Sequence, residues 1–301
     1  MDKLSEKDIT SALKDSSAFA KLPPAGKLKL LFEEVKKYGD VKEADFGCWN
    51  ETPDRDSVIT QEERFDEIMG VLQMSAPGHT LQVLDDRGLM KFCLPHCLPI
   101  KQKMYRRTYN KILSNIDNCK ETDLAKRINF FMFPFGPENT RQTLEESNFE
   151  PEWIQLMTDA IDQCMTFIEI KDKKSCRLFV GKYGRDFYLY MCDYTEQLYL
   201  LINASEKPEK GKRRPKPKEI LAEVEKEGDP LRIKDLDISR SDLEAIGIEG
   251  RESQNAIMDT LLKHCEKMPS DNQHDILMGL AERYYSSKLK KWLWTKTSQK
   301  G

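Results

Sequence analysis

Apolar residues recur at helical spacing along most of this chain. A helix is predicted to begin after Thr60, because threonine followed three residues later by glutamate, here Glu63, is the pattern of a capping box. The apolar positions that follow keep a period of 3.6 residues and are Phe65, Ile68, Met69 and Leu72. No sustained alternation with a period of two appears, so strands are not expected. The pattern predicts an all-α protein.

Proline and glycine divide the predicted helices. Pro23 and Pro24 separate helices predicted over Ser5–Ala20 and Ala25–Tyr38, and Gly39 ends the second of these. A turn-rich stretch, Glu51–Ser57, then marks a boundary. Further helices are predicted over Lys103–Ile116, Asp123–Met132, Glu152–Ile168, Cys176–Lys182 and Asp186–Asn203. We therefore expect three successive helical blocks.

The C-terminal stretch Asp229–Lys263 predicts two short helices joined by a hairpin that contains glycine. Ser239 can cap the first helix, with Asp242 in the capping-box position, and Gly247 suits the left-handed residue that ends it. Gly250 precedes the second helix. The apolar stripe expected on that helix consists of Ile257, Leu261, Cys265 and Met268.

The beginning of this second helix is a candidate site for phosphate. A helix entered through glycine leaves backbone N–H groups free and carries a partial positive charge at its N-terminus. Arg251 would add a side-chain cation at the same place. An ordinary helical hairpin without a ligand is the alternative reading of the same residues.

This stretch resembles the tail of bacterial class II tRNA nucleotidyltransferases, the CCA-adding enzymes. The residues that carry the resemblance are Pro230-Leu231, Ile233–Leu236, Ile238, Asp242-Leu243, Ile246–Ile248, Gly250, Ile257 and Leu261-Leu262. Two positions depart from the family pattern. Arg240 or Ser241 stands where glycine is common, and Gln254 replaces the second glycine of the hairpin, so close approach of the backbone to RNA is less favoured than in the family.

Upstream segments resemble other parts of the same enzymes. Ile59–Met69 and Leu84–Pro95 are similar to two further segments of the family, and Ser16–Trp49 is similar in layout to the neck that follows the catalytic head. The resemblance implies an elongated multi-helical fold without that head. The expected regions are a neck-like region at 1–58, a helical body at 59–204, a basic linker at 205–228 and a helical tail with the RNA-binding hairpin at 229–301.

Charge and composition limit the classes of partner. The formal net charge of −3 argues against a uniformly basic nucleic-acid binder. No apolar run approaches the length needed to cross a bilayer, and the first ten residues lack the core of a signal peptide. We therefore expect a cytoplasmic protein with no membrane partner, whose eight cysteines are reduced thiols.

Positive charge is concentrated between the predicted body and tail, in Lys207–Lys218, where prolines discourage regular structure. Two interpretations stay open for this segment: a strap that contacts phosphates, or a solvated linker. The residues expected to support RNA binding electrostatically are Lys212, Arg213, Arg214, Lys216 and Lys218.

One cluster has residue types that could bind a metal ion. Cys93, His96 and Cys97 offer three ligands, but no second pair of cysteine or histidine residues stands nearby to complete a tetrahedron. We expect buried small side chains and a histidine at a helix end instead, and no metal.

The resemblance also implies where an active site would have to be. The head of those enzymes carries a Gly-Gly-x-x-Arg-Asp turn followed by Asp-x-Asp, whose carboxylates hold two metal ions. Asp54–Asp56 and Asp235–Asp237 both read Asp-x-Asp, and Val180–Asp186 imitates the glycine turn. The first pair precedes the turn and sits in a loop, while the second lies within the tail pattern. We therefore expect no catalytic residues among them.

Many members of the family also carry a histidine–aspartate metal site in the body. The segment that aligns with it is Phe131–Gly136, in which Phe133 and Pro134 stand where histidine and aspartate would bind the metal. Neither side chain can donate an electron pair, so this centre is not expected. The sequence has no Gly-x-Ser-x-Gly elbow, phosphate-binding P-loop or Gly-x-Gly-x-x-Gly, and no cofactor is expected.

These observations predict an RNA-binding protein without a nucleotidyltransferase active site of its own. The resemblance implies that its ligand is the stacked acceptor and T arms of tRNA, bound by Gly250, Arg251 and Glu252. A separately encoded nucleotidyltransferase head, or another protein, is a further expected partner. The alternative is a helical scaffold for protein–protein interaction that has kept the fold and lost RNA binding.

Overall fold

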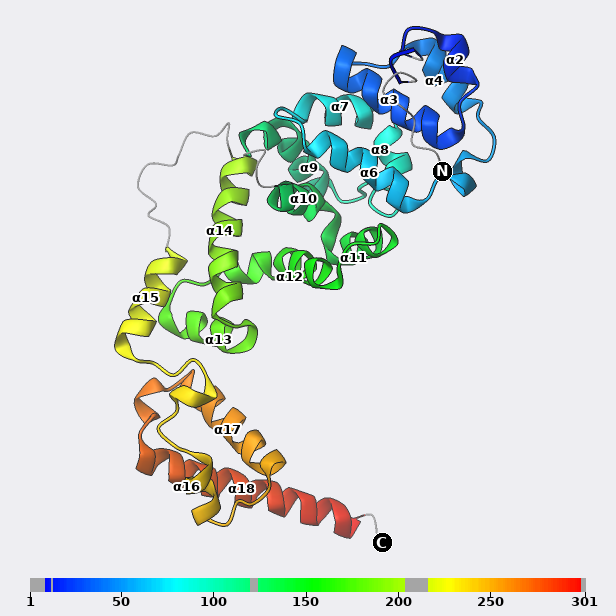
Figure 1. Cartoon of the computed structure of the whole chain (residues 1–301). Helices are drawn as coiled ribbons and strands as arrows, with labels where there is room; N and C mark the ends of the chain where they lie inside the picture. Colours follow the sequence, from blue (N-terminus) through cyan, green and yellow to red (C-terminus); the bar gives the residue numbers. More distant parts are fainter. Residues whose placement is uncertain (1–8, 12, 120–123, 204–215, 299–301) are drawn as a thin grey trace. The chain divides into compact units, whose positions relative to one another are not determined.

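The computed structural model describes residues 9–11, 13–119, 124–203 and 216–298, and the side chains of the same residues except 16 and 288–298. Every regular element within these ranges is a helix (Figure 1). The predicted all-α class is therefore confirmed.

Two compact units divide the chain. Residues 1–164 and 194–208 form the first unit, and residues 165–193 and 209–301 form the second. The boundaries fall within α12 (Pro151–Ile168) and α14 (Arg185–Ile202). The division into neck, body and tail, which follows from the family resemblance, is a different one and stays an interpretation.

The first unit is built from short helices. They are α2 (Ser16–Ala20), α3 (Pro24–Tyr38), α4 (Glu43–Asn50), α5 (Arg55–Val58), α6 (Gln61–Leu72), α7 (Gly78–Asp86), α8 (Leu89–Cys93), α9 (Lys103–Asn115), α10 (Leu124–Met132), α11 (Gly136–Glu146) and most of α12. Helix α3 packs against α6 and α7, and α10 packs against α6 and α9. The core between them is apolar and includes Leu31, Phe32, Ile68, Ile112 and Phe131.

Local capping signals explain where several of these helices begin and end. The predicted capping box is present, because Thr60 Oγ1 accepts from the Glu63 amide at 3.2 Å and Glu63 Oε2 accepts from the Thr60 amide at 3.0 Å. Gly39 ends α3 with φ +80°, as expected. The helix predicted over Ser5–Ala20 is not continuous, because Asp15 caps a new helix by accepting from the Ser17 amide at 2.9 Å.

A buried arginine connects α10 to the end of α6. Arg127 is only 1% exposed and donates to several backbone carbonyls. Its Nη1 donates to the carbonyls of Leu72 at 2.8 Å and Met74 at 2.6 Å, and its Nη2 donates to the Cys119 carbonyl at 2.6 Å. These carbonyls lie at the C-terminal end of α6 and in the loops beyond it, where helical backbone leaves acceptors unpaired.

Replacing this guanidinium should therefore destabilise the first unit. We expect Arg127→Met to lower the free energy of unfolding by about 3 kcal/mol or more, because several buried carbonyls lose their donor. Urea unfolding followed by circular dichroism measures this. The matched control is Arg107→Met on the exposed face of α9, which should change the free energy by less than about 0.5 kcal/mol. Equal effects of the two substitutions would contradict this role for Arg127.

Two carboxyl groups are buried together between α3 and α4. Glu34 is 1% exposed and Asp45 is fully buried. Lys42 Nζ lies 3.1 Å from Glu34 Oε1 and 3.5 Å from Asp45 Oδ2, so one ammonium group lies within ion-pair distance of both carboxyl groups. Burial, with the neighbouring Asp45 carboxyl as a further cause, raises the pKa of Glu34 to about 7.

This pair predicts a fall in stability with rising pH. The folded-state pKa of Glu34 lies above its ordinary value of 4.5. The stabilisation of the folded state by the protonated Glu34 side chain is therefore complete below pH 4.5 and is lost as the pH rises through about 7. Glu34→Gln should remove this part of the pH dependence, measured as urea midpoints between pH 4.5 and 8. Glu33→Gln, one residue away on the same helix, should retain the wild-type slope. If both variants show the wild-type pH dependence of the urea midpoint, this role for Glu34 is contradicted.

The second unit contains the remaining helices. They are the end of α12, α13 (Lys173–Tyr183), the beginning of α14, α15 (Pro217–Glu227), α16 (Arg240–Ala245), α17 (Arg251–Cys265) and α18 (His274–Ser298). Half of the segment expected as a basic linker, residues 205–228, is thus the helix α15, which packs against α13. Pro217 does not prevent this, because it occupies the first helical position, where its missing N–H costs no hydrogen bond.

A buried ion pair fixes the tail to α13. Arg177 Nη1 lies 2.6 Å from Asp229 Oδ2, and Arg177 Nε donates to the Glu266 carbonyl at 2.8 Å. The Glu266 side chain fills the space beside Gly181, where an added Cβ would come within 1.7 Å of its Oε1. Both contacts require α13 and the end of α17 to meet in one arrangement.

No helix in the described part of the chain has the length and apolar character needed to span a membrane.

Candidate nucleic-acid interface

The predicted hairpin is formed by α16 and α17. Ser239 caps α16, because its Oγ accepts from the Asp242 amide at 3.3 Å while Asp242 Oδ2 accepts from the Ser239 amide at 2.7 Å. The hydrogen bonds from Ser239 also lower the pKa of the Asp242 carboxyl. Both helices pack on a common core with α18. Its buried residues are Leu236, Ile238, Leu243, Ile248, Ile257, Met258, Leu261, Cys265, Leu277 and Ala281.

Two glycines shape the turn between the helices. Gly247 has φ +78° and its amide donates to the Glu244 carbonyl at 2.9 Å, and the Ile248 amide donates to the Leu243 carbonyl at 2.9 Å. Gly250 has φ +86°. Side chains are disfavoured at such angles, so the predicted role of glycine at both positions is confirmed.

Helix α17 begins at Arg251 without a side-chain cap. Gly250 is its N-cap residue, and its carbonyl accepts from the Gln254 amide at 3.0 Å. A Cβ built on Gly250 would have no neighbouring atom within 4 Å, so the position beside this glycine is open. We call this end of α17, with Gly250, Arg251, Glu252 and Ser253, the mouth.

The charges at the mouth nearly balance. Arg251 is exposed there, and Arg240, the first residue of α16, reaches the next turn of α17, where its Nη2 donates to Asn255 Oδ1 at 2.8 Å. Glu249 and Glu252 are exposed on the same turn. A carboxylate in the first turn of a helix interacts favourably with its dipole, so Glu252 competes with any anion from outside. Binding here would depend on the amides and on local geometry rather than on net charge.

Gln254 stabilises the hairpin from inside. The side chain is only 4% exposed, and its Nε2 donates to the Ile248 carbonyl at 3.2 Å and to Glu244 Oε1 at 3.1 Å. The family resemblance suggested that a residue other than glycine at this position would hinder approach to the backbone. In the structure its side chain points into the hairpin and leaves the mouth clear. Sequence reasoning did not identify this role, because the partners of Gln254 lie on another helix and in the turn.

Two of the basic residues expected to support RNA binding lie within the described part of the chain, and both have carboxylate neighbours. Lys212, Arg213 and Arg214 lie outside the described residues. Lys216 Nζ lies 2.7 Å from Glu219 Oε1, and Lys218 Nζ lies 2.6 Å from Asp193 Oδ1. Both lysines are more than half exposed, but each already has a carboxylate partner, which reduces its charge toward an external phosphate.

The possible metal ligands near Cys93 have other roles. Cys93 and Cys97 are buried, and burial raises the pKa of the Cys97 thiol to about 11, so it is protonated at neutral pH. His96 instead contacts Glu146, with 2.8 Å between Nε2 and Oε2. The expectation that the two cysteines are buried small side chains is confirmed, and His96, which was expected at a helix end, lies in the turn after α8. Among the described residues, no three histidine, cysteine, aspartate or glutamate side chains are grouped to hold a metal ion.

The sequences that imitate catalytic motifs have structural roles. Asp235 Oδ2 accepts from the Leu231 amide at 3.2 Å, and Asp237 Oδ2 accepts from the His274 amide at 3.1 Å. Both aspartates therefore stabilise turns of the tail.

The segment Val180–Asp186 and the segment aligned with the family's metal site also have local roles. Gly184 separates α13 from α14, and Arg185 pairs with Glu225 of α15, with 2.5 Å between Nε and Oε1. Phe133–Phe135 forms a short 3-10 helix with Pro134 and Phe135 buried.

Comparisons with protein-family models, with curated proteins and with solved structures found no match in any of the three. The interpretation of the hairpin therefore depends on its own residues and geometry.

We expect Gln254→Leu to lower the local stability of the tail. Removing the amide leaves the buried Ile248 carbonyl without this donor, at a cost of about 1–3 kcal/mol in local stability. Hydrogen exchange measured by mass spectrometry should show faster exchange of the amides around Ile257 and Leu261. Asp259→Leu, an exposed position on the same helix, is the control and should leave exchange unchanged. Unchanged exchange in Gln254→Leu would show that the internal hydrogen bonds contribute little.

Proposed function

We propose that this chain binds folded RNA of the transfer-RNA type through the mouth of α17. The observation that carries the proposal is an exposed helix N-terminus entered through Gly250, with no side-chain cap and no neighbouring atom within 4 Å of the place where a Cβ on Gly250 would stand. Backbone N–H groups at such an end point outward, and the helix dipole favours an anion there. The proposed role is binding, and the ligand that the family resemblance implies is the acceptor and T arms of tRNA.

The chemistry of RNA fits a site of this kind. Double-helical RNA hides its base edges in a deep, narrow groove, so proteins recognise it through its shape, phosphates and ribose hydroxyls. Amides of Arg251, Glu252 and Ser253 can donate to one phosphate, with the Arg251 guanidinium beside it. Arg240 of α16, whose side chain contacts Asn255 of α17, can contact a neighbouring phosphate of the same strand.

The charge distribution limits how strong this binding is. With a net charge of −3 and a balanced mouth, we expect only about two to four phosphate contacts, and hence a salt slope of roughly −2 to −3. Lys212, Arg213 and Arg214 are proposed to add to this slope, while Lys216 and Lys218 add less because they pair within the chain. A separately encoded nucleotidyltransferase head stays a predicted partner.

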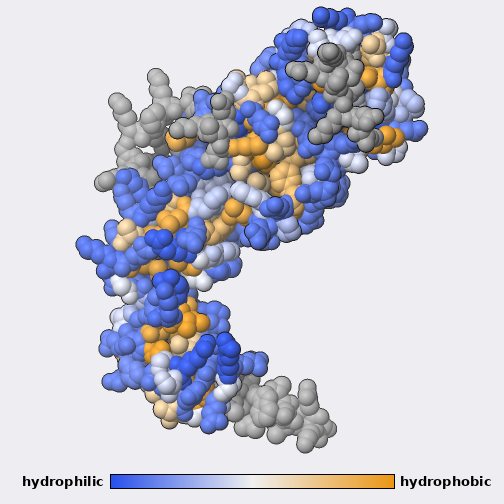
Figure 2. Space-filling view, viewed as in Figure 1, coloured by the Kyte–Doolittle hydropathy of each residue, from blue (hydrophilic) through white to orange (hydrophobic). Residues whose placement is uncertain are grey.

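Surface apolar residues support a second candidate, a scaffold for protein–protein interaction. Met165 and Ile168 are 66% and 50% exposed and lie one turn apart on α12. Apolar patches also interrupt the mainly hydrophilic surface on the face drawn in Figure 2. Exposed apolar groups of this kind are typical of contact surfaces. This candidate predicts no preference for tRNA over other polyanions.

Reversing the charge at the mouth tests the RNA proposal. We expect Arg251→Glu to weaken tRNA binding about tenfold or more and to make the salt slope less steep by about 1, because one charge-assisted phosphate contact is replaced by repulsion. Fluorescence anisotropy with labelled tRNA between about 50 and 200 mM salt measures both quantities.

The control is Arg107→Glu on α9, which makes the same change of charge in the first unit. It should alter affinity by less than about twofold, since Arg107 does not belong to the mouth and an exposed charge outside a contact acts only through screened interactions. If the two variants bind tRNA alike, the mouth is not the site. If the wild type binds no better than an unrelated acidic protein, the scaffold is favoured instead.

A further inference from the structure

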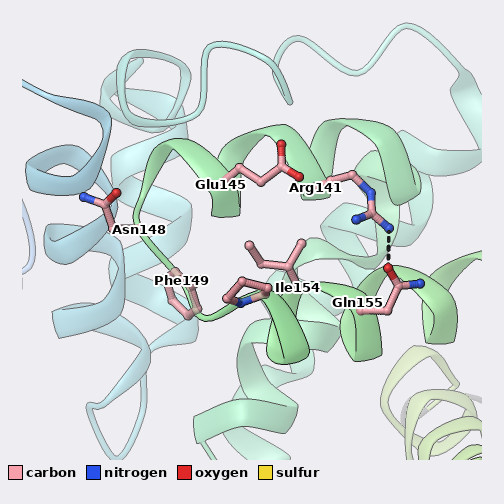
Figure 3. A pocket seen from close by; sticks show the side chains of 7 residues that line it. Arg141, Glu145, Asn148, Phe149, Ile154 and Gln155 are labelled. Atoms are coloured by element: carbon pink, nitrogen blue, oxygen red, sulfur yellow. Dashed lines mark hydrogen bonds between the residues drawn. The ribbon is translucent and has the colours of Figure 1, made fainter.

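A pocket of about 390 Å³ lies where α11 turns into α12, within the first unit (Figure 3). Its wall on α11 carries Arg141 and Glu145, and Gln155 lies opposite on α12. Its floor is apolar and is formed by Phe149, Pro151 and Ile154. The volume is near the lower end of the range found for small-molecule sites, which suits a ligand smaller than a nucleotide.

The position of Arg141 is set by contacts with α12. Its Nη2 donates to Thr158 Oγ1 at 2.8 Å and to Gln155 Oε1 at 3.3 Å. Thr158 is 2% exposed and its hydroxyl donates in turn to the Ile154 carbonyl at 2.8 Å, so it accepts from the arginine. The other terminal nitrogen of Arg141 points toward the space above Ile154 (Figure 3). A guanidinium held in this way needs little reordering to bind an anion.

Glu145 brings a negative charge to the same pocket. It lies one turn after Arg141 on α11, a spacing at which such residues commonly pair. Within the described part of the chain neither side chain forms an ion pair, because Arg141 is directed toward α12. The carboxyl group of Glu145 also lies above Ile154 (Figure 3). The pocket thus presents one cation and one anion, side by side, over an apolar surface.

The apolar floor is rigid. Ile154 is 4% exposed, and the ring of Phe149 packs edge-on against Phe65 of α6 at a centroid distance of 5.5 Å. The turn itself is held to α6 because Asn148 Nδ2 donates to Glu62 Oε2 at 2.8 Å. These contacts keep the floor in place whether or not a ligand is present.

We propose that this pocket binds a free apolar α-amino acid. The carboxylate of the ligand contacts Arg141, its ammonium group contacts Glu145, and its side chain lies on Phe149, Pro151 and Ile154. A zwitterion satisfies both charges at once, whereas a simple carboxylic acid would be repelled by Glu145 and a simple amine by Arg141. The site is open to water, so we expect a Kd of about 0.1–1 mM.

Changes to the ligand test the proposal without disturbing the fold. The probes are L-phenylalanine, N-acetyl-L-phenylalanine, which lacks the ammonium group, and L-phenylalaninamide, which lacks the carboxylate. Titration of the full-length protein is followed by chemical shifts of the amides of Glu145, Phe149 and Gln155. We expect L-phenylalanine to shift them and each blocked form to bind about tenfold more weakly or worse, since each loses one charge-assisted contact.

Glu145→Gln tests whether Glu145 is the residue that contacts the ammonium group of the ligand. This substitution leaves Arg141 and its contacts with α12 unchanged. This variant should bind L-phenylalanine about as weakly as the wild type binds the N-acetyl form, with no further loss for the N-acetyl form. Glu138→Gln, an exposed position on the same helix outside the pocket, should bind like the wild type.

Absence of shifts at the pocket with L-phenylalanine at about ten times the expected Kd would overturn the proposal. Equal binding of all three probes, or an unchanged preference in Glu145→Gln, would also overturn it. This outcome is independent of RNA binding, because the pocket and the mouth share no residues.

Discussion

Unpaired backbone groups at helix ends are the constraint on which this all-helical chain depends. Every helix leaves N–H groups at one end and carbonyls at the other, and a chain of many short helices has many such ends. Thr60 and Ser239 satisfy N–H groups locally. Arg127 satisfies carbonyls at the end of α6, and Arg177 donates to a carbonyl beyond α17. Both arginines are buried, so the positions of neighbouring helices depend on them.

The mouth of α17 is an end that the chain leaves open. Gly250 provides no side chain there, and the side chain of Gln254, in the first turn of the helix, is buried with its partners inside the hairpin. The same internal contacts hold Gly247 and Gly250 at the angles that expose the amides. Because acidic and basic residues balance around this end, its affinity for phosphate has to come from oriented N–H groups.

Features that depend on neighbours in the sequence could be predicted, and those that depend on contacts between helices could not. The Ser239 cap and the two hairpin glycines involve residues within a few positions, so their patterns identified them correctly. Met268 was expected on the apolar stripe of α17, but it is 51% exposed because the helix ends at Cys265 and the chain turns away. The pairing of Lys218 with Asp193, which is distant in sequence, could not be predicted either, and the expected role of Lys218 in RNA binding stays a prediction.

The most direct test of the account is the ¹⁵N–¹H spectrum of the full-length protein titrated with an RNA that reproduces the stacked acceptor and T arms. We predict that the amides of Arg251, Glu252 and Ser253 shift first and furthest, with Asn255 following. Shifts that are confined to other surfaces, or spectra that do not change at saturating RNA, would contradict the proposed binding at the mouth of α17.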